Sequence, residues 1–211
     1  MLEVELNSVD DNPLVDLEGE VVHHGGNFYG GHVCFAMDGL KSAVASVADL
    51  LDRQLALLCM PETNGGLPAN LVASGKVSHH GFKAMQISAS ALTAEALKLT
   101  VPAAAFSRST ESHNQDKVSM GTIAARDCLR ILDLSETVAA ILLLAASQAV
   151  DLRGPDICCP RSVALRDAVR TEVPMLRTDR RQDRDIEGIV RLHHAGFIPC
   201  PPPVDVHCRY A

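Results

Sequence analysis

The polar side chains between residues 109 and 116 form the part of this sequence that is best suited to chemistry. They read Ser109-Thr-Glu-Ser-His-Asn-Gln-Asp116, and a long apolar segment follows them. We predict a helix that begins at about Lys117, which places Asn114, Gln115 and Asp116 at its N-terminus. Unpaired N–H groups and the positive end of the helix macrodipole would stabilise an anion or an electrophile there. Because one residue suffices to cap a helix, the surplus of polar groups predicts a functional site.

The elements that must position this segment are predicted to be long helices. Only 3% of the residues are aromatic, and Ala and Leu recur at helical spacing. We predict helices over about 31–60, 82–99 and 117–153, the last on the order of 50 Å long at the rise of an α-helix. Shorter helices are expected at 161–172 and 184–194. The Pro-rich segment 199–203 that follows is predicted to be an exposed tail, with a polyproline ligand as the alternative.

The length of these helices indicates a larger assembly than one small domain. Along the first helix, apolar residues at alternating steps of three and four predict one continuous apolar seam: Val33, Met37, Leu40, Val44, Val47, Leu51, Leu55 and Leu58. A 211-residue globule could not cover all such faces, so we predict a mainly all-α fold that belongs to a larger helix bundle. Along the chain we expect an extended or loop segment over 1–30, the long-helix bundle over 31–153, and short helices with the tail over 154–211.

Composition and charge exclude several classes of partner. The formal net charge of −7 argues against nucleic acid, because nucleic-acid binding concentrates Lys and Arg on one face. The apolar run over 138–146 is far shorter than the roughly 20 residues that span a bilayer. The seven cysteines form no Cys-x-x-Cys pair, and neither His23-His24 nor His79-His80 completes a metal-ligand spacing. We therefore expect a cytoplasmic protein without a metal, a membrane anchor or a nucleic-acid partner.

Several short elements, in this order, resemble those of the aromatic amino acid ammonia-lyase and aminomutase family, most closely its phenylalanine-type members. They are Asn7-Ser-Val-Asp-Asp-Asn-Pro13, His24-Gly-Gly-Asn-Phe28, Gly81-Phe-Lys83, Glu111-Ser-His-Asn-Gln-Asp116, Ala146-Ser-Gln-Ala-Val-Asp-Leu-Arg153 and Thr178-Asp-Arg180. The resemblance covers nearly the whole chain but only the second half of the family. It implies the central long-helix bundle of the ammonia-lyase, aspartase-like fold.

The resemblance also implies roles for six residues. Catalytic roles fall to Glu111, Asn114 and Gln115, and substrate-binding roles to Phe28, Lys83 and Ile87. Glu111 would accept a proton from the substrate amine or bind ammonium, and Asn114 and Gln115 would line the pocket beside the amine. Lys83 and Ile87 lie four residues apart on one helical face, where they would contact the aromatic ring of the substrate.

The residue at position 115 separates substrate classes within the family. Histidine-type members carry Glu there, whereas this chain carries Gln115, so histidine is not the expected substrate. Phenylalanine and tyrosine cannot be separated from these residues. Ammonia-lyase and 2,3-aminomutase activities also stay open, because they share an electrophile and differ in whether ammonia escapes or returns to the β-carbon.

The cofactor that the resemblance implies is 4-methylidene-imidazol-5-one, which forms in the family from an Ala-Ser-Gly tripeptide. This chain contains Ala73-Ser74-Gly75, but the sequence around it differs from the family element, so we do not expect the cofactor there. The family's electrophile, tyrosine base and carboxylate-binding element precede the Asn-Pro element. We therefore expect the N-terminal half of the lyase on another chain, in a tetrameric assembly that binds an aromatic amino acid. The alternative is a truncated, catalytically silent scaffold.

Overall fold

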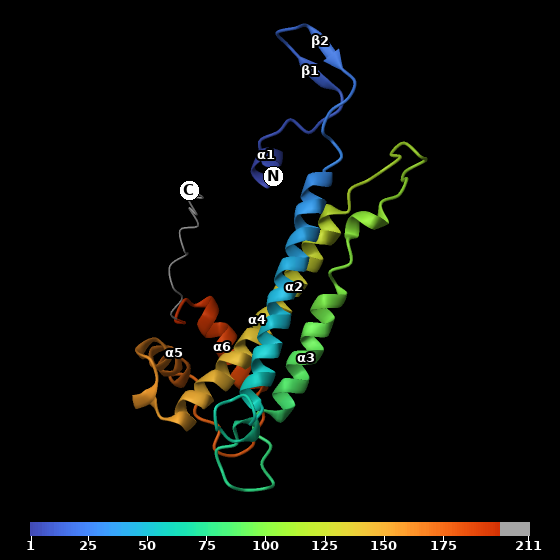
Figure 1. Cartoon of the computed structure of the whole chain (residues 1–211). Coiled ribbons are helices and arrows are strands. Elements are labelled where there is room, and N and C mark those ends of the chain that lie inside the picture. The colour runs from blue at the N-terminus through green and yellow to red at the C-terminus, as the bar shows by residue number, and fades with distance from the viewer. Residues whose placement is uncertain (199–211) are drawn as a thin grey trace, which may run out of the picture. The chain divides into compact units, whose positions relative to one another are not determined.

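The computed structural model describes residues 1–198, and helices dominate them, which confirms the predicted mainly all-α fold (Figure 1). The predicted tail at 199–203 lies outside the described residues. Five helices correspond to predicted ones: α2 (Gly31–Cys59), α3 (Lys83–Lys98), α4 (Gly121–Arg153), α5 (Pro160–Arg170) and α6 (Asp183–His194). No helix among residues 1–198 is both long and apolar enough to cross a membrane.

The segment before α2 contains a hairpin and one short helix. Strands β1 (Leu14–Asp16) and β2 (Val21–His23) pair antiparallel, with Val15 opposite Val22 (Figure 1). Extended pieces were predicted in this region, whereas helix α1 (Leu2–Leu6) was not. It is too short to show a helical period in the sequence.

Contacts divide the chain into two compact units that interleave along the sequence. Unit 1 comprises Met1–Leu50 and Ala91–Ser135, and unit 2 comprises Leu51–Ser90 and Glu136–Ala211, of which the structure describes residues up to 198. Helices α2, α3 and α4 each contribute residues to both units. The division into segments 1–30, 31–153 and 154–211 stays a prediction.

The core of unit 1 is built from small and aliphatic side chains. Ala45 of α2 and Ala96 of α3 pack with Ile131 and Leu134 of α4. A second cluster joins Cys34, Ala103 and Ala124, and Ala103 belongs to the short helix η2 (Ala103–Phe106). Small residues allow helix backbones to approach closely, so the three helices pack tightly around this core.

Unit 2 surrounds the C-terminal part of α4 with shorter elements. These are η1 (Ala69–Leu71), η3 (Pro155–Ile157), α5 and α6. Its interior includes Phe82, Ile141, Val169 and Ile189, all of them fully or almost fully buried. Helix α4 ends before Gly154, whose φ of 98° is accessible to glycine, and Pro160 occupies the first turn of α5, where its missing N–H costs nothing.

The buried face of α2 differs from the predicted apolar seam by about one residue. The buried positions are Cys34, Asp38, Lys41, Ala45, Ala48, Asp52, Leu55 and Cys59. Only Leu55 belongs to both sets. Small residues and an internal ion pair fill the interior, whereas the larger Leu40, Val47 and Leu50 remain exposed. An apolar face therefore lies on the surface of α2, which is the arrangement expected of a helix from a larger bundle.

Candidate active site

The loop that carries Glu111, Asn114 and Gln115 lies between η2 and α4 in unit 1. Thr110 and Gln115 form an antiparallel backbone bridge, with Thr110 N to Gln115 O at 3.0 Å and Gln115 N to Thr110 O at 3.4 Å. Within the turn, Asn114 N donates to Glu111 O at 2.8 Å. We call the segment from Ser107 to Val118 the site loop.

Three consecutive residues of the site loop adopt the left-handed backbone conformation. Glu111, Ser112 and His113 have φ values of 47°, 52° and 64°. This conformation is unfavourable for residues other than glycine and tends to persist where function requires it. The loop therefore retains a costly backbone at the residues that the sequence singles out for chemistry.

The predicted place of this loop at a helix N-terminus is wrong. Helix α4 begins at Gly121, so the N–H groups of its first turn lie beyond Asn114, Gln115 and Asp116. The reason lies within the loop: the Thr110–Gln115 bridge and the contacts of Ser107 with Val118 hold the segment in a turn. The macrodipole argument does not apply to these side chains, because the effect falls off within one helical turn.

The base of the site loop is closed by the Ser107 hydroxyl. Its Oγ donates to Val118 O at 2.6 Å and accepts the N–H of Val118 at 3.2 Å. One side chain thus satisfies both backbone groups of the residue at the other end of the loop. The contact between Ser107 and Val118 thus closes the loop at its two ends, away from its polar tip.

A buried ion pair fixes the segment that leads into the site loop. Asp38 accepts the N–H groups of Ala103 and Ala104 at 2.9 and 3.2 Å, and Lys41 Nζ donates to Val101 O at 2.9 Å. Lys41 is 0% exposed and lies 2.9 Å from Asp38. Burial raises the pKa of Asp38, but the hydrogen bonds from Lys41 and the two N–H groups outweigh it, so the pKa lies below its usual value.

The Gly-Gly-Asn-Phe element lies beside the C-terminal end of the site loop. Lys117 Nζ lies 5.5 Å from the centre of the Tyr29 ring, a cation–π contact. Gly30 has a φ of 67°, and a Cβ there would lie 3.4 Å from Ser119 Oγ. Two elements that are about ninety residues apart in sequence thus meet within unit 1. Phe28 precedes these contacts and is 50% exposed.

Glu5 is a buried carboxylate that the sequence did not single out. Its Oε2 accepts a hydrogen bond from Asn27 Nδ2 at 3.0 Å and lies 3.1 Å from His32 Nδ1. These contacts join the Asn-Pro element to the Gly-Gly-Asn-Phe element and hold the residue before Phe28. The one signal in the sequence is that Glu5 lies next to the Asn-Pro element. The burial of a single carboxylate cannot be predicted from so short a segment.

Lys83 and Ile87 lie at the start of α3 in unit 2, on one exposed face as predicted. The backbone before them is tightly fixed: Phe82 is buried, and its N–H donates to Asn70 O at 2.9 Å. Gly81 has a φ of 53°, and a Cβ there would lie 2.4 Å from Asn70 O. Only glycine fits at this close approach.

The six candidate residues are thus divided between the units. Phe28, Glu111, Asn114 and Gln115 belong to unit 1, whereas Lys83 and Ile87 belong to unit 2. The side chains of Glu111, Asn114 and Gln115 are exposed and make no hydrogen bond or ion pair with any residue from 1 to 198. Their polar groups are free to bind a molecule from outside, and their roles stay predictions.

The tripeptide Ala73-Ser74-Gly75 lies in unit 2, in the loop between η1 and α3. Ser74 Oγ lies 2.5 Å from His79 Nδ1, and the loop borders an open cavity of about 400 Å³. The serine hydroxyl is engaged by a neighbouring side chain, and the loop leads into a helix as an ordinary turn does. That no cofactor forms at this tripeptide stays a prediction.

Thiols and metal-ligating groups are dispersed. Cys34, Cys59, Cys128, Cys158 and Cys159 are the free cysteines among residues 1–198. The same part of the chain contains no group of three or more His, Cys, Asp or Glu residues that could hold a metal ion.

Comparison with known proteins identifies relatives of the whole described fold. The sequence model of the aromatic amino acid lyase family matches residues 1–171. The tyrosine ammonia-lyase of Cupriavidus metallidurans is 42% identical over 199 residues, which are 94% of this chain and 37% of the relative. The histidine ammonia-lyase of Aromatoleum aromaticum is 41% identical over 207 residues, which are 97% of this chain and 39% of the relative.

Solved structures show the same fold. The crystal structure of tyrosine aminomutase from Streptomyces globisporus superposes with a TM-score of 0.86 at 39% identity, over 93% of this chain and 37% of that one. A relative from the same organism is named a MIO-dependent tyrosine 2,3-aminomutase and is 41% identical over 187 residues, 88% of this chain and 34% of the relative. The chain thus spans less than two fifths of the length of each of these four relatives.

Proposed function

Because the chain belongs to the aromatic amino acid lyase family, we propose that it is the C-terminal part of an aromatic amino acid ammonia-lyase. The reaction removes ammonia from phenylalanine or tyrosine: a β-proton is lost, the bond between the α-carbon and nitrogen breaks, and a cinnamate-type acid forms. Activity requires the N-terminal half of the lyase, which corresponds to the part of the relatives that precedes the matched region. The observation that carries this proposal is the exposed tip of the site loop, where the side chains of Glu111, Asn114 and Gln115 have no partner among residues 1–198.

Each candidate residue receives a role in this reaction. Glu111 accepts a proton at the substrate amine or binds the ammonium, and Asn114 and Gln115 line the pocket beside it. Phe28 packs against the substrate, and Lys83 and Ile87 contact its ring. The N-terminal half would hold the cofactor 4-methylidene-imidazol-5-one, which would supply the electrophile that the elimination needs.

The surface of α2 supports the proposal that this chain packs against the rest of the lyase. Leu40, Val47 and Leu50 are exposed apolar residues at spacings of seven and three, so they share one face of the helix within unit 1. Exposed apolar faces of this kind are typical of surfaces that pack against another protein. We propose that the N-terminal half and further copies cover them in a tetrameric assembly.

A 2,3-aminomutase is the second candidate function, and the Streptomyces globisporus relative favours it. The two activities would use the same residues and differ in whether ammonia leaves the pocket or adds to the β-carbon. A catalytically silent scaffold is the third candidate. The backbone at 111–113 argues against a scaffold, because three consecutive left-handed residues are costly and tend to persist where function requires them.

Reconstitution tests these candidates. We would co-express the chain with the part of the Cupriavidus metallidurans tyrosine ammonia-lyase that precedes the matched region. We expect the two chains to co-purify, to absorb in the near ultraviolet, and to release cinnamate from phenylalanine or coumarate from tyrosine. A β-amino acid product would assign the aminomutase instead. A stable complex with the absorbance but without turnover would favour the scaffold, and activity of the isolated chain would place the electrophile at Ala73-Ser74-Gly75.

Substitutions assign the residues within the active complex. Glu111→Gln and Gln115→Ala should reduce kcat at least about tenfold without dissociating the complex. Glu62→Gln is the matched control, because Glu62 is an exposed carboxylate outside the site loop. If Glu111→Gln left turnover at the level of the control, the proposed role of Glu111 would be wrong.

A further inference from the structure

The start of α3 is held by a carboxylate from about one hundred residues further along the chain. Asp179 Oδ2 accepts the N–H of His80 at 2.7 Å, and its Oδ1 accepts the N–H of Gly81 at 3.0 Å. Both N–H groups directly precede α3, which begins at Lys83. The hydrogen bond from His80 is the main cause that lowers the pKa of Asp179 below its usual value, in spite of some burial.

Lys83 occupies an unfavourable place for a lysine. The N-terminus of a helix carries positive partial charge, which stabilises acidic residues and destabilises basic ones. Yet α3 has no acidic residue in its first turn, and Lys83 is its first residue. The position of Lys83 is thus not explained by the helix dipole. Asp179 supplies from outside the helix the negative charge that the first turn lacks.

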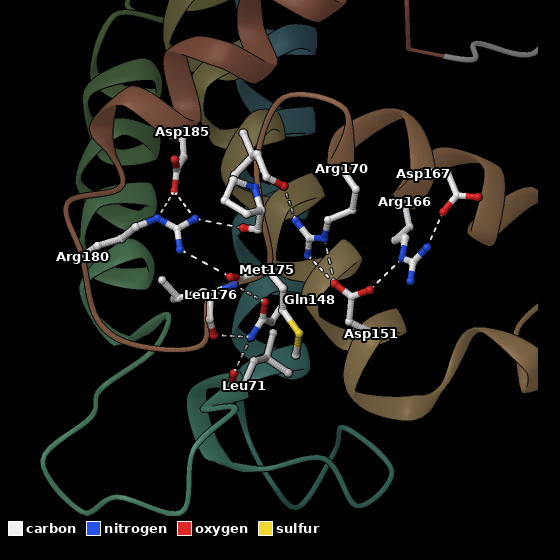
Figure 2. A network of polar contacts seen from close by, with 12 residues as sticks. Leu71, Gln148, Asp151, Arg166, Asp167, Arg170, Met175, Leu176, Arg180 and Asp185 are labelled. Carbon is white, nitrogen blue, oxygen red and sulfur yellow. Dashed lines mark hydrogen bonds and ion pairs between the residues drawn. The ribbon is translucent and has the colours of Figure 1, made fainter.

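The segment that carries Asp179 is fixed to α4 by a buried amide. Gln148 is 1% exposed; its Nε2 donates to Leu176 O at 2.9 Å, and its Oε1 accepts the N–H of Leu176 at 3.0 Å (Figure 2). The same Nε2 lies 3.3 Å from Leu71 O, which belongs to the segment that packs before α3. One side chain thus joins the two chain segments that flank the start of α3.

Arg180 holds the other side of this segment. Its Nη2 donates to Pro174 O at 2.9 Å and lies 2.8 Å from Asp185 Oδ2 at the start of α6 (Figure 2). The residue next to Asp179 is therefore tied to its own loop and to a helix. Two residues of the short element Thr178-Asp-Arg180 thus make different contacts. Arg180 fixes the loop, and Asp179 binds the backbone at the start of α3.

We propose that Asp179 is a positioning residue that fixes the first turn of α3 and so directs Lys83 and Ile87 toward the substrate ring. The inference rests on the proposed function for the substrate. It goes beyond that function by assigning a role to a residue outside the six candidate site residues, through its contacts with the backbone before α3. Gly81 allows the close approach of the chain to Asn70, and Asp179 then sets the direction in which α3 leaves this turn.

Hydrogen exchange on the isolated chain tests the contact itself. Asp179→Ala should increase the exchange rates of the His80 and Gly81 amides at least about tenfold, and Asp179→Asn should give an intermediate value because it keeps one acceptor oxygen. The matched control is Asp183→Asn, which removes an exposed carboxylate that pairs with Arg181 instead. Unchanged exchange at residues 80 and 81 in Asp179→Ala would overturn the inference, whatever the chain does as an enzyme.

A double-mutant cycle in the reconstituted complex tests the consequence. Asp179→Ala should raise KM about tenfold with a smaller change in kcat, and should have almost no further effect when Lys83→Ala is already present. A merely structural role would lower the apparent kcat in either background, because less of the enzyme would be folded, and would leave KM unchanged. Independent, multiplying effects of the two substitutions would overturn the positioning role. A complex without turnover would refute the proposed function and with it the role of Lys83, while the exchange rates would still decide whether Asp179 holds the helix start.

Discussion

The site loop of unit 1 and the start of α3 in unit 2 both carry candidate site residues, but they are held by different means. The site loop closes on itself through the Thr110–Gln115 bridge and the hydroxyl of Ser107. The start of α3 is fixed by Asp179, which lies about one hundred residues away in the sequence. A self-closed loop leaves its polar tip free for a ligand, whereas a helix start held from outside fixes the direction of a side chain.

The polar side chains that are buried beneath these two segments also differ. Unit 1 buries a charged pair, Asp38 and Lys41, under the segment that leads to the site loop. Unit 2 buries a neutral amide, Gln148, between the segments that flank α3 (Figure 2). A buried charge that loses its partner is penalised more than a neutral polar group that does so. Replacing Lys41 in unit 1 should therefore destabilise the chain more than replacing Gln148 in unit 2.

The largest effect is expected for Lys41→Met, which leaves Asp38 buried without its counter-charge. We expect the free energy of unfolding of the chain to fall by about 3–5 kcal/mol in chemical denaturation. Lys98→Met, at an exposed lysine of the same unit, is the matched control and should change it by less than about 0.5 kcal/mol.

Cysteine labelling localises this effect. Burial raises the pKa of Cys34 and of Cys128, so both thiols should resist alkylation at neutral pH in the wild-type chain. Mass spectrometry should detect faster labelling of both in Lys41→Met. If the variant were as stable as Lys98→Met, the charged pair would not be what holds unit 1 together.

A smaller decrease in the free energy of unfolding is expected for Gln148→Leu in unit 2. The substitution nearly preserves volume but leaves the N–H and the carbonyl of Leu176 without their buried partner, which should cost about 2–4 kcal/mol. Gln54→Leu makes the same change at an exposed position of the same unit and should be close to neutral. If Gln148→Leu lowered the unfolding free energy more than Lys41→Met does, the expected order of the two substitutions would be wrong.

The helices were predictable because their signals are local. The expected ranges 82–99 and 184–194 differ from α3 and α6 by one residue at most. The start of α4 was not predictable from the apolar period, because the Thr110–Gln115 bridge and Ser107 delay the helix to Gly121. The buried side of α2 was displaced for a similar reason, since a lysine and an aspartate that pair in the interior resemble surface residues in the sequence.

The candidate site was predictable only as a set of residue types. The resemblance selected the site loop and the start of α3, and the structure adds how each is held. Asp179 belongs to a short element that the sequence singled out without a role, and its contact with His80 spans ninety-nine residues. Glu5 was missed because nothing in a short polar segment predicts that one carboxylate is buried. Contacts between distant segments have no periodic signal in the sequence.

A modest, pH-dependent effect is expected at the start of α3. The pKa of Asp179 is lowered in the folded chain, so its contribution to stability is complete above the unfolded value of about 4 and is lost as the pH falls through the folded value. Asp179→Asn cannot titrate. The wild type should therefore exceed the variant in unfolding free energy at pH 7, and the difference should shrink at pH values below about 4, as measured by denaturation across that range. A constant difference would mean that the carboxylate charge does not act on α3.

The smallest effect on stability, with the opposite sign, is expected in the site loop. Glu111 holds a left-handed backbone at a φ of 47°, and asparagine tolerates that conformation better than glutamate does. Because the Glu111 side chain has no partner among residues 1–198, Glu111→Asn should raise the unfolding free energy by about 0.5 kcal/mol or leave it unchanged. The same variant should reduce turnover in the reconstituted complex, because asparagine can neither accept the proton nor bind ammonium as a carboxylate does. A clear loss of stability would mean that Glu111 supports the fold, and the contrast between a free loop tip and a fixed helix start would no longer hold.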